Sequence, residues 1–142
     1  FEDVLSMSDI KRGQMPRGER VIVVDVIGEL FKVYSLAAAV FCGGSLVPRG
    51  GQNILEAAAW GKLVFYGPSM DDFREEKALL EGVGAGITVE DEEGLYAGIV
   101  SMLSSPEKLT KSGAAGKRVV AANKGASMRY AALIEDIIAK RS

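Results

Sequence analysis

The sequence predicts an α/β fold: a parallel β-sheet with helices on both faces. Short apolar runs at 21–24, 38–42, 63–66 and 87–89 have the length and composition of buried strands. Helical patterns stand between and after these runs, at 27–37, 54–60, 71–81 and 95–103. This alternation, with short links, is typical of βαβ units, in which a helix joins two parallel strands.

The ends of the chain and the helix starts add further expectations. Residues 1–8 are predicted to end a helix, because Phe1, Val4 and Leu5 have helical spacing, and 11–20 is predicted to be a polar loop. Asp71 or Asp72 is expected to cap one helix, and the acids at 90–93 to begin the next. Pro106 should open a helix that breaks at 123–125, before a last helix at 127–140.

Composition limits the classes of function. The 142 residues, 48% of them hydrophobic and 25% charged, suit one soluble globular domain or one half of a larger two-domain enzyme. A net charge of −2 gives no electrostatic footprint for nucleic acid. There is no histidine, and the single Cys42 excludes an internal disulfide and is expected to be a buried, reduced thiol. Because the chain starts at Phe1 and not at Met, we expect it to be part of a longer protein.

The glycine-rich stretch 43–53 is the strongest functional signal. It follows an apolar run and precedes an alanine-rich helix, and it contains the pairs Gly43–Gly44 and Gly50–Gly51. Glycines let a ligand approach the backbone, and the N-terminus of the following helix favours an anion. The stretch therefore predicts an anion site, most plausibly for a nucleotide. Neither the Walker spacing nor the dinucleotide fingerprint occurs.

Three loops should follow the carboxyl ends of the predicted strands, at 25–29, 43–53 and 67–71. Ligands of such sheets bind beyond these ends, so the loops are expected to lie side by side along one edge. In the first loop, the N–H groups of Gly28 and Glu29 could bind an anion or merely start a helix.

Each polar residue of the glycine-rich stretch could have either of two roles. Asn53 and Glu56 share one face of the first helical turn, where they could form a capping box or hold a ligand, Glu56 by accepting hydrogen bonds from two ribose hydroxyls. Ser45 could contact a ligand or cap its own turn. Arg49 could be a solvated charge or meet a phosphate or a sugar carboxylate.

Taken together, the motifs resemble those of a known enzyme family. The segments fall in the order seen in 3-deoxy-D-manno-octulosonic acid (Kdo) transferases: Asp25–Leu30, Gly43–Leu46, Gly50–Glu56, Gly67–Pro68 and Asn123–Ala126. The resemblance covers about residues 21–129. It implies a GT-B glycosyltransferase with two Rossmann-like domains, of which residues 1–142 would form most of the C-terminal, donor-binding one.

The resemblance implies transfer of Kdo from CMP-Kdo to a lipid A precursor in lipopolysaccharide synthesis, at the cytoplasmic face of the bacterial inner membrane. The residues expected to bind the donor are Ile27, Gly28, Glu29, Leu30, Gly44, Ser45, Arg49, Gly51, Gln52, Asn53 and Glu56. Family members often have His at the position of Gln52. No catalytic residue is expected in this chain, because the family's catalytic base lies in the N-terminal domain.

The same resemblance implies that the acceptor domain, the membrane-attaching segment and the first strand of the donor domain, with its basic residues, lie outside this chain. The fragment alone should be soluble, inactive and at best a weak binder of CMP. No cofactor or metal is expected, because the sequence has no carboxylate cluster of the DxD type and helix N-termini could stabilise the leaving phosphate. Two alternatives stay open: a UDP-sugar transferase or epimerase of related fold, and a non-catalytic α/β interaction module.

Overall fold

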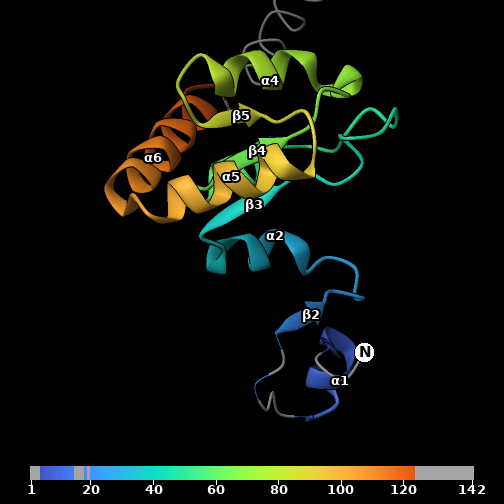
Figure 1. The fold of residues 1–142 in the computed structure, drawn as a ribbon. Coiled ribbons are helices and arrows are strands. Elements are labelled where there is room, and N and C mark those ends of the chain that lie inside the picture. Colours follow the sequence, from blue (N-terminus) through green and yellow to red (C-terminus); the bar gives the residue numbers. More distant parts are fainter. Residues whose placement is uncertain (1–3, 15–17, 19, 124–142) are drawn as a thin grey trace, which may run out of the picture. The chain divides into compact units, whose positions relative to one another are not determined.

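The structure, a computed structural model, describes residues 4–14, 18 and 20–123. The chain divides into two compact units, Phe1–Leu36 and Ala37–Ser142 (Figure 1).

The second unit is built on a parallel sheet whose strand order is β3-β4-β5. The strands are β3 (Ala39–Phe41), β4 (Leu63–Tyr66) and β5 (Gly86–Thr88). Val40 lies opposite Val64, and Phe65 lies opposite Ile87. These strands confirm the three apolar runs that the sequence assigns here. The central strand is wholly apolar and buried along its length, as expected of a parallel strand covered on both faces.

Helices cover both faces of this sheet (Figure 1). Their bounds are α3 (Leu55–Ala59), the 3₁₀ helix η2 (Asp71–Phe73), α4 (Arg74–Glu81), α5 (Glu92–Leu103) and α6 (Pro106–Asn123). On one face Leu63 and Phe65 pack with Met102 of α5, and a Cβ on Gly98 would lie 2.9 Å from the Phe65 ring. On the other face α6 crosses at Gly116, where a Cβ would lie 2.8 Å from that of Ala85.

Local sequence signals set most helix starts in this unit. The Asp91 carboxylate accepts a hydrogen bond from the Gly94 N–H at 2.8 Å and caps α5, and Pro106 is the first residue of α6, as predicted. The predicted aspartate cap of α4 is wrong. Its N-cap is Phe73, without a side-chain cap, because η2 intervenes and the Asp71 carboxylate pairs with Arg74 instead.

The first unit is a parallel pair of strands with short helices. Its elements are β1 (Val4–Ser6), α1 (Met7–Lys11), β2 (Val21–Val23), α2 (Leu30–Val33) and the 3₁₀ helix η1 (Tyr34–Leu36). The prediction of a helix end over 1–8 is wrong for 4–6. There Val4 pairs with Val21 and the buried Leu5 with Ile22, so strand pairing overrides the helical spacing. The predicted helix 27–37 is confirmed only over 30–36. Residues 30–33 form α2, and the last three residues, 34–36, have 3₁₀ geometry.

The strand β2 forms where the sequence predicts one, but the prediction that it is buried is wrong. Val21, Ile22 and Val23 keep 47–49% of their surface exposed. Within the described part of the first unit β2 pairs only with β1. The parallel α/β class is confirmed, but the strands fall into a two-stranded and a three-stranded sheet.

Two sequence predictions concern the C-terminal end. The helix α6 runs to Asn123, so the predicted break at 123–125 and the helix at 127–140 lie outside the described residues. Among the helices that the structure describes, none has the length and hydropathy needed to cross a bilayer.

Candidate functional site

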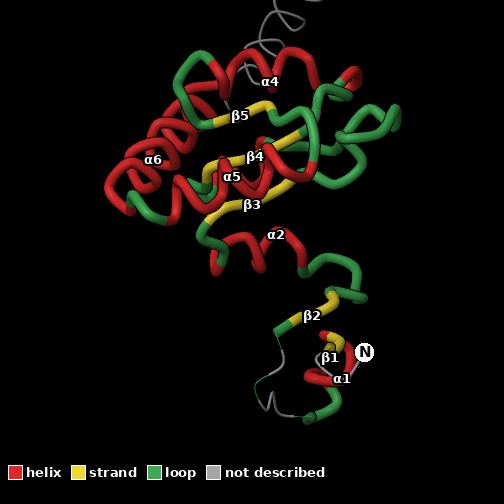
Figure 2. Tube along the Cα trace, viewed as in Figure 1, coloured by secondary structure: helices red, strands yellow, loops and turns green. Residues whose placement is uncertain are grey.

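The glycine-rich loop, residues 43–53, and the turn after β4, residues 67–70, leave the same end of the second unit's sheet (Figure 2). The Ser69 N–H donates to the Ser45 carbonyl at 2.9 Å, and the Gly50 N–H donates to the Ser69 Oγ at 3.2 Å. Two of the three loops that the sequence predicts at one edge are therefore in direct contact.

Ser45 lies inside this junction and is fully buried. Its hydroxyl donates to the Cys42 carbonyl at 2.6 Å and accepts the Gly67 N–H at 2.7 Å. Of the two sequence readings, the side chain therefore takes the structural one. It ties the end of β3 to the end of β4, and its hydroxyl is not free to contact a ligand.

Glycine is required at three positions of the junction. A Cβ on Gly67 would overlap the Ser45 carbonyl oxygen, so the turn could not approach the loop with any other residue. Gly50 and Gly51 have φ values of +77° and +76°, and side chains there would overlap Asp72 and Met70. These glycines let the loop pack closely on the residues that follow β4.

Cys42, just before the glycine-rich loop, contacts Gln52 near its end. Its sulfur accepts the Gln52 N–H at 3.2 Å, and the Sγ lies 3.6 Å from the Gln52 carbonyl oxygen as a donor. Cys42 is a free, buried cysteine, as the sequence predicts, and burial raises the pKa of its thiol. A protonated thiol can both donate and accept, which suits this bridging position.

The capping box expected at the start of α3, with Asn53 as the N-cap, is wrong: the N-cap is Ile54, without a side-chain cap. The Asn53 Oδ1 accepts the Leu55 N–H at 3.0 Å, which supports the first turn. Glu56 lies in that turn, partly exposed, and makes no hydrogen bond or ion pair with another described residue. The Glu56 carboxylate is thus available as an acceptor at the edge of the loop, and its ribose role stays a prediction.

Other polar groups of the loop are also exposed. Arg49, Gln52 and Asn53 are exposed, and within the part of the chain that the structure describes the Arg49 guanidinium has no hydrogen-bond or ion-pair partner. Gly44 and Gly51 are partly exposed, so their backbone can be reached from solvent. The loop and the first turn of α3 therefore carry an exposed cation, exposed amides and a partly exposed acid, the kinds of group that bind a nucleotide phosphate and ribose.

The remaining predicted residues belong to the first unit. Ile27 and Leu30 are exposed, Gly28 has a φ of +86°, and Glu29 is the N-cap of α2. The Lys11 Nζ lies 2.6 Å from the Glu29 Oε1, and this contact lowers the pKa of the Glu29 carboxyl. The meeting of this loop with the two loops of the second unit stays a prediction.

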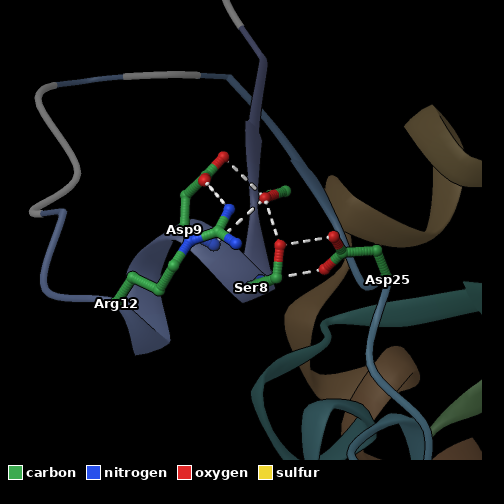
Figure 3. Close-up of polar contacts among 5 residues, drawn as sticks. Ser8, Asp9, Arg12 and Asp25 are labelled. Carbon is green, nitrogen blue, oxygen red and sulfur yellow. Dashed lines mark hydrogen bonds and ion pairs between the residues drawn. The ribbon is translucent and has the colours of Figure 1, made fainter.

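A polar network that the sequence reading missed joins β1, α1 and the end of β2 (Figure 3). The Asp25 carboxylate accepts the Ser8 N–H at 2.8 Å and the Ser8 hydroxyl at 2.6 Å, and these bonds lower its pKa. The Ser6 hydroxyl accepts the Asp9 N–H at 3.1 Å and caps α1. The spacing of Ser6 and Asp9 is a capping signal that could have located this helix start.

Among residues 4–14, 18 and 20–123, no group of three or more Cys, Asp or Glu side chains is placed to hold a metal ion. The described groups of the candidate site are backbone amides and one guanidinium, which suit an anion, and one carboxylate, which can accept hydrogen bonds from hydroxyls.

Comparisons with known proteins identify similar sequences and a similar structure. No family model matches the chain. The chain is 36% identical to the 3-deoxy-D-manno-octulosonic acid transferase of Aquifex aeolicus over 89 residues, 63% of this chain and 25% of that protein. It is 33% identical to the enzyme of the same name from Haemophilus influenzae over 117 residues, 82% of this chain and 27% of that protein. The chain thus spans about a quarter of the length of these curated relatives.

A solved structure matches the fold. The crystal structure of the C-terminal CMP-Kdo binding domain of WaaA from Acinetobacter baumannii superposes with a TM-score of 0.73 at 27% identity, over 82% of this chain and 60% of that one. The sequence and structural matches agree on one family and one region. The chain belongs to the 3-deoxy-D-manno-octulosonic acid transferase family and corresponds to the C-terminal domain of these glycosyltransferases.

Proposed function

We propose that residues 1–142 form the donor-binding domain of a Kdo transferase and bind CMP-Kdo through the glycine-rich loop. The observation that carries this proposal is the structural match to a CMP-Kdo binding domain, at 27% identity, over 82% of the chain. The exposed loop supports it independently, because its free carboxylate, guanidinium and accessible backbone are groups that recognise a nucleotide.

Within this proposal each part of the loop has a chemical role. The Glu56 carboxylate accepts hydrogen bonds from the two ribose hydroxyls, and Asn53 holds the start of α3 through the Leu55 N–H. The accessible backbone of Gly44 and Gly51 and the Arg49 side chain face the phosphate and the acidic sugar. Gln52 contributes an uncharged hydrogen-bonding side chain.

Isothermal titration calorimetry of the 142-residue chain with CMP and UDP tests the proposal. We expect CMP to bind and UDP to bind at least about tenfold more weakly, a difference of about 1.4 kcal/mol. Equal binding of both would favour a UDP-sugar enzyme. No heat with CMP, UDP or CMP-Kdo would contradict the proposal and favour an interaction module.

The substitution Glu56→Gln tests the ribose contact. Losing a charged acceptor that binds two hydroxyls should weaken CMP binding by about 1.5–3 kcal/mol, or roughly ten- to a hundredfold. The matched control is Glu93→Gln, which changes an exposed acid in the first turn of α5. Unchanged CMP affinity in the Glu56 variant would remove the ribose role but leave the domain assignment standing.

For the whole protein we propose transfer of Kdo from CMP-Kdo to a lipid A precursor at the cytoplasmic face of the bacterial inner membrane. The names of the relatives support the Kdo-transfer part. Closing of the acceptor domain over the donor would exclude water from the transfer. Incubating the full-length enzyme with CMP-Kdo and a lipid A precursor, with and without EDTA, should give a Kdo-bearing lipid in both cases.

A further inference from the structure

We propose that Ser45 is a positioning residue, whose buried hydroxyl sets the conformation in which the glycine-rich loop receives its ligand. The proposal rests on the proposed function for what the ligand is. The geometry of Ser45 and its partners lies within the second unit and does not depend on the proposed function.

Ser45 contributes its hydroxyl and its backbone carbonyl to a set of hydrogen bonds, here called the brace, that ties the glycine-rich loop to the end of β3 and to the turn after β4. The hydroxyl bridges the Cys42 carbonyl and the Gly67 N–H, at 2.6 Å and 2.7 Å, with no exposed surface. The Ser45 carbonyl accepts the Ser69 N–H at 2.9 Å. The start of the loop is therefore held to the turn by both the hydroxyl and the carbonyl of Ser45.

The brace continues to the far side of the loop. The Ser69 hydroxyl accepts the Gly50 N–H at 3.2 Å, and one residue beyond Gly51 the Gln52 N–H is bonded to the Cys42 sulfur at 3.2 Å. Both ends of the segment between Gly43 and Gln52 are thus held, while Arg49 between them stays exposed. A loop whose two ends are held by hydrogen bonds and whose middle is exposed is preformed for binding. Ordering such a loop costs little conformational entropy when the ligand binds.

Two features show that the hydroxyl cannot be replaced by packing alone. Removing it would leave the Gly67 N–H and the Cys42 carbonyl buried without this partner, which is costly in an apolar interior. Gly67 also packs so closely on the Ser45 carbonyl that a side chain would overlap it, so the turn has no room to find another partner. We therefore expect the loop to shift or open when the hydroxyl is lost.

The test compares Ser45→Ala with Val89→Ala in the 142-residue chain. Val89 is buried in the core and none of the brace hydrogen bonds involves its side chain, so this variant reports general destabilisation. Binding of CMP is measured by calorimetry at a temperature where both variants are folded. We expect Ser45→Ala to weaken CMP binding roughly tenfold, the effect of two lost hydrogen bonds on loop order, and Val89→Ala to leave it unchanged.

Amide hydrogen exchange provides a readout that does not need a ligand. In Ser45→Ala the Gly67, Ser69 and Gly50 amides should exchange at least tenfold faster, while the Val64 amide in β4 keeps its protection. Unchanged exchange at the three amides would overturn the brace, even in a chain that binds no nucleotide. Absence of CMP binding in the wild-type chain would instead count only against the proposed function.

A milder variant covers the case in which Ser45→Ala does not fold. Ser69→Ala removes only the acceptor of the Gly50 N–H, from a partly exposed side chain. We expect faster exchange at Gly50 and a smaller loss of CMP affinity. Faster exchange at Gly50 with full CMP affinity would show that the brace does not position the binding loop and would overturn the proposal.

Discussion

Strands β2 and β4 look alike in the sequence and differ sharply in the structure. Both are short, continuous apolar runs that predict a buried parallel strand. The four residues of β4 are at most 1% exposed, whereas the three of β2 are 47–49% exposed. The difference lies in their neighbours: β4 has a strand on each side, whereas among the described residues β2 pairs only with β1.

The comparison shows that an apolar run reports a preference for burial and not its extent. Around β4, helices on both sheet faces remove the side chains from water, and α5 approaches closely at Gly98. In the first unit the side chains of β2 and of Ile27 and Leu30 stay exposed, without comparable cover among the described residues of that unit. Stability should therefore be concentrated in the second unit.

The largest expected effect contrasts Phe65→Ala with Ile22→Ala. Phe65 is fully buried, so its truncation should lower the free energy of unfolding by about 3–5 kcal/mol. Ile22 is 47% exposed, and its truncation should cost about 1 kcal/mol or less. Urea denaturation followed by circular dichroism measures both. Equal losses would mean that β2 is as deeply buried in solution as β4.

A second prediction concerns close packing beside β4. A Cβ on Gly86 would overlap the Tyr66 hydroxyl and lie 3.0 Å from the Leu80 Cβ. Gly86→Ala should therefore cost about 1–3 kcal/mol of unfolding free energy. The cost should fall in a Tyr66→Phe background, where the overlapping oxygen is gone, so a double-mutant cycle from denaturation curves checks the contact. Additive effects would contradict it.

The Tyr66 hydroxyl itself gives a smaller effect of opposite sign. By geometry it is buried without a hydrogen-bond partner among the described residues, and burial, followed by the nearby Glu81 carboxylate, raises the pKa of the phenol. Tyr66→Phe should leave stability unchanged or raise it by up to about 1 kcal/mol, because no hydrogen bond is lost. Thermal unfolding measures the change, and a loss of more than about 1 kcal/mol would show that the hydroxyl has a partner in solution.

The smallest expected effect is a pH dependence confined to the first unit. Ser8 lowers the pKa of Asp25 below its usual value of 3.8, so the ionised carboxylate favours the folded state. This contribution is present above that value and is lost as the pH falls through the lower, folded-state pKa. Nuclear magnetic resonance should show the Ser8 amide titrating below pH 3.8 while β4 amides stay unchanged, and Asp25→Asn should abolish the titration.

The sequence predicted more of the second unit than of the first. Its three strands and its helices α3, α5 and α6 follow from apolar runs, from the acids at 90–93 and from Pro106. In the first unit the helical spacing of Val4 and Leu5 predicted the wrong element, because two residues cannot distinguish a helix from a strand that pairs elsewhere. The aspartate expected to cap α4 forms an ion pair with Arg74 instead, which spacing alone does not reveal.

The sequence identified the residues of the candidate site but only part of how their side chains are arranged. The glycine-rich loop and the turn after β4 meet as the strand order requires. The sequence could not decide between the two roles of Ser45, because a hydroxyl in a glycine-rich turn suits a ligand and a buried brace equally. It also could not show that Asn53 supports the helix while the Glu56 carboxylate stays free.

By itself, the sequence determined the α/β class, the strands of the second unit and the position of the glycine-rich loop. These depend on residues close together in the chain: apolar runs, helix caps and glycines. The tertiary structure alone decided that β4 is buried and β2 exposed, and that the Ser45 hydroxyl faces inward. Burial and hydrogen-bond partners are set by segments distant in the chain, such as β4 and the loop that precedes α3. A local sequence pattern therefore does not show which distant segment packs against it.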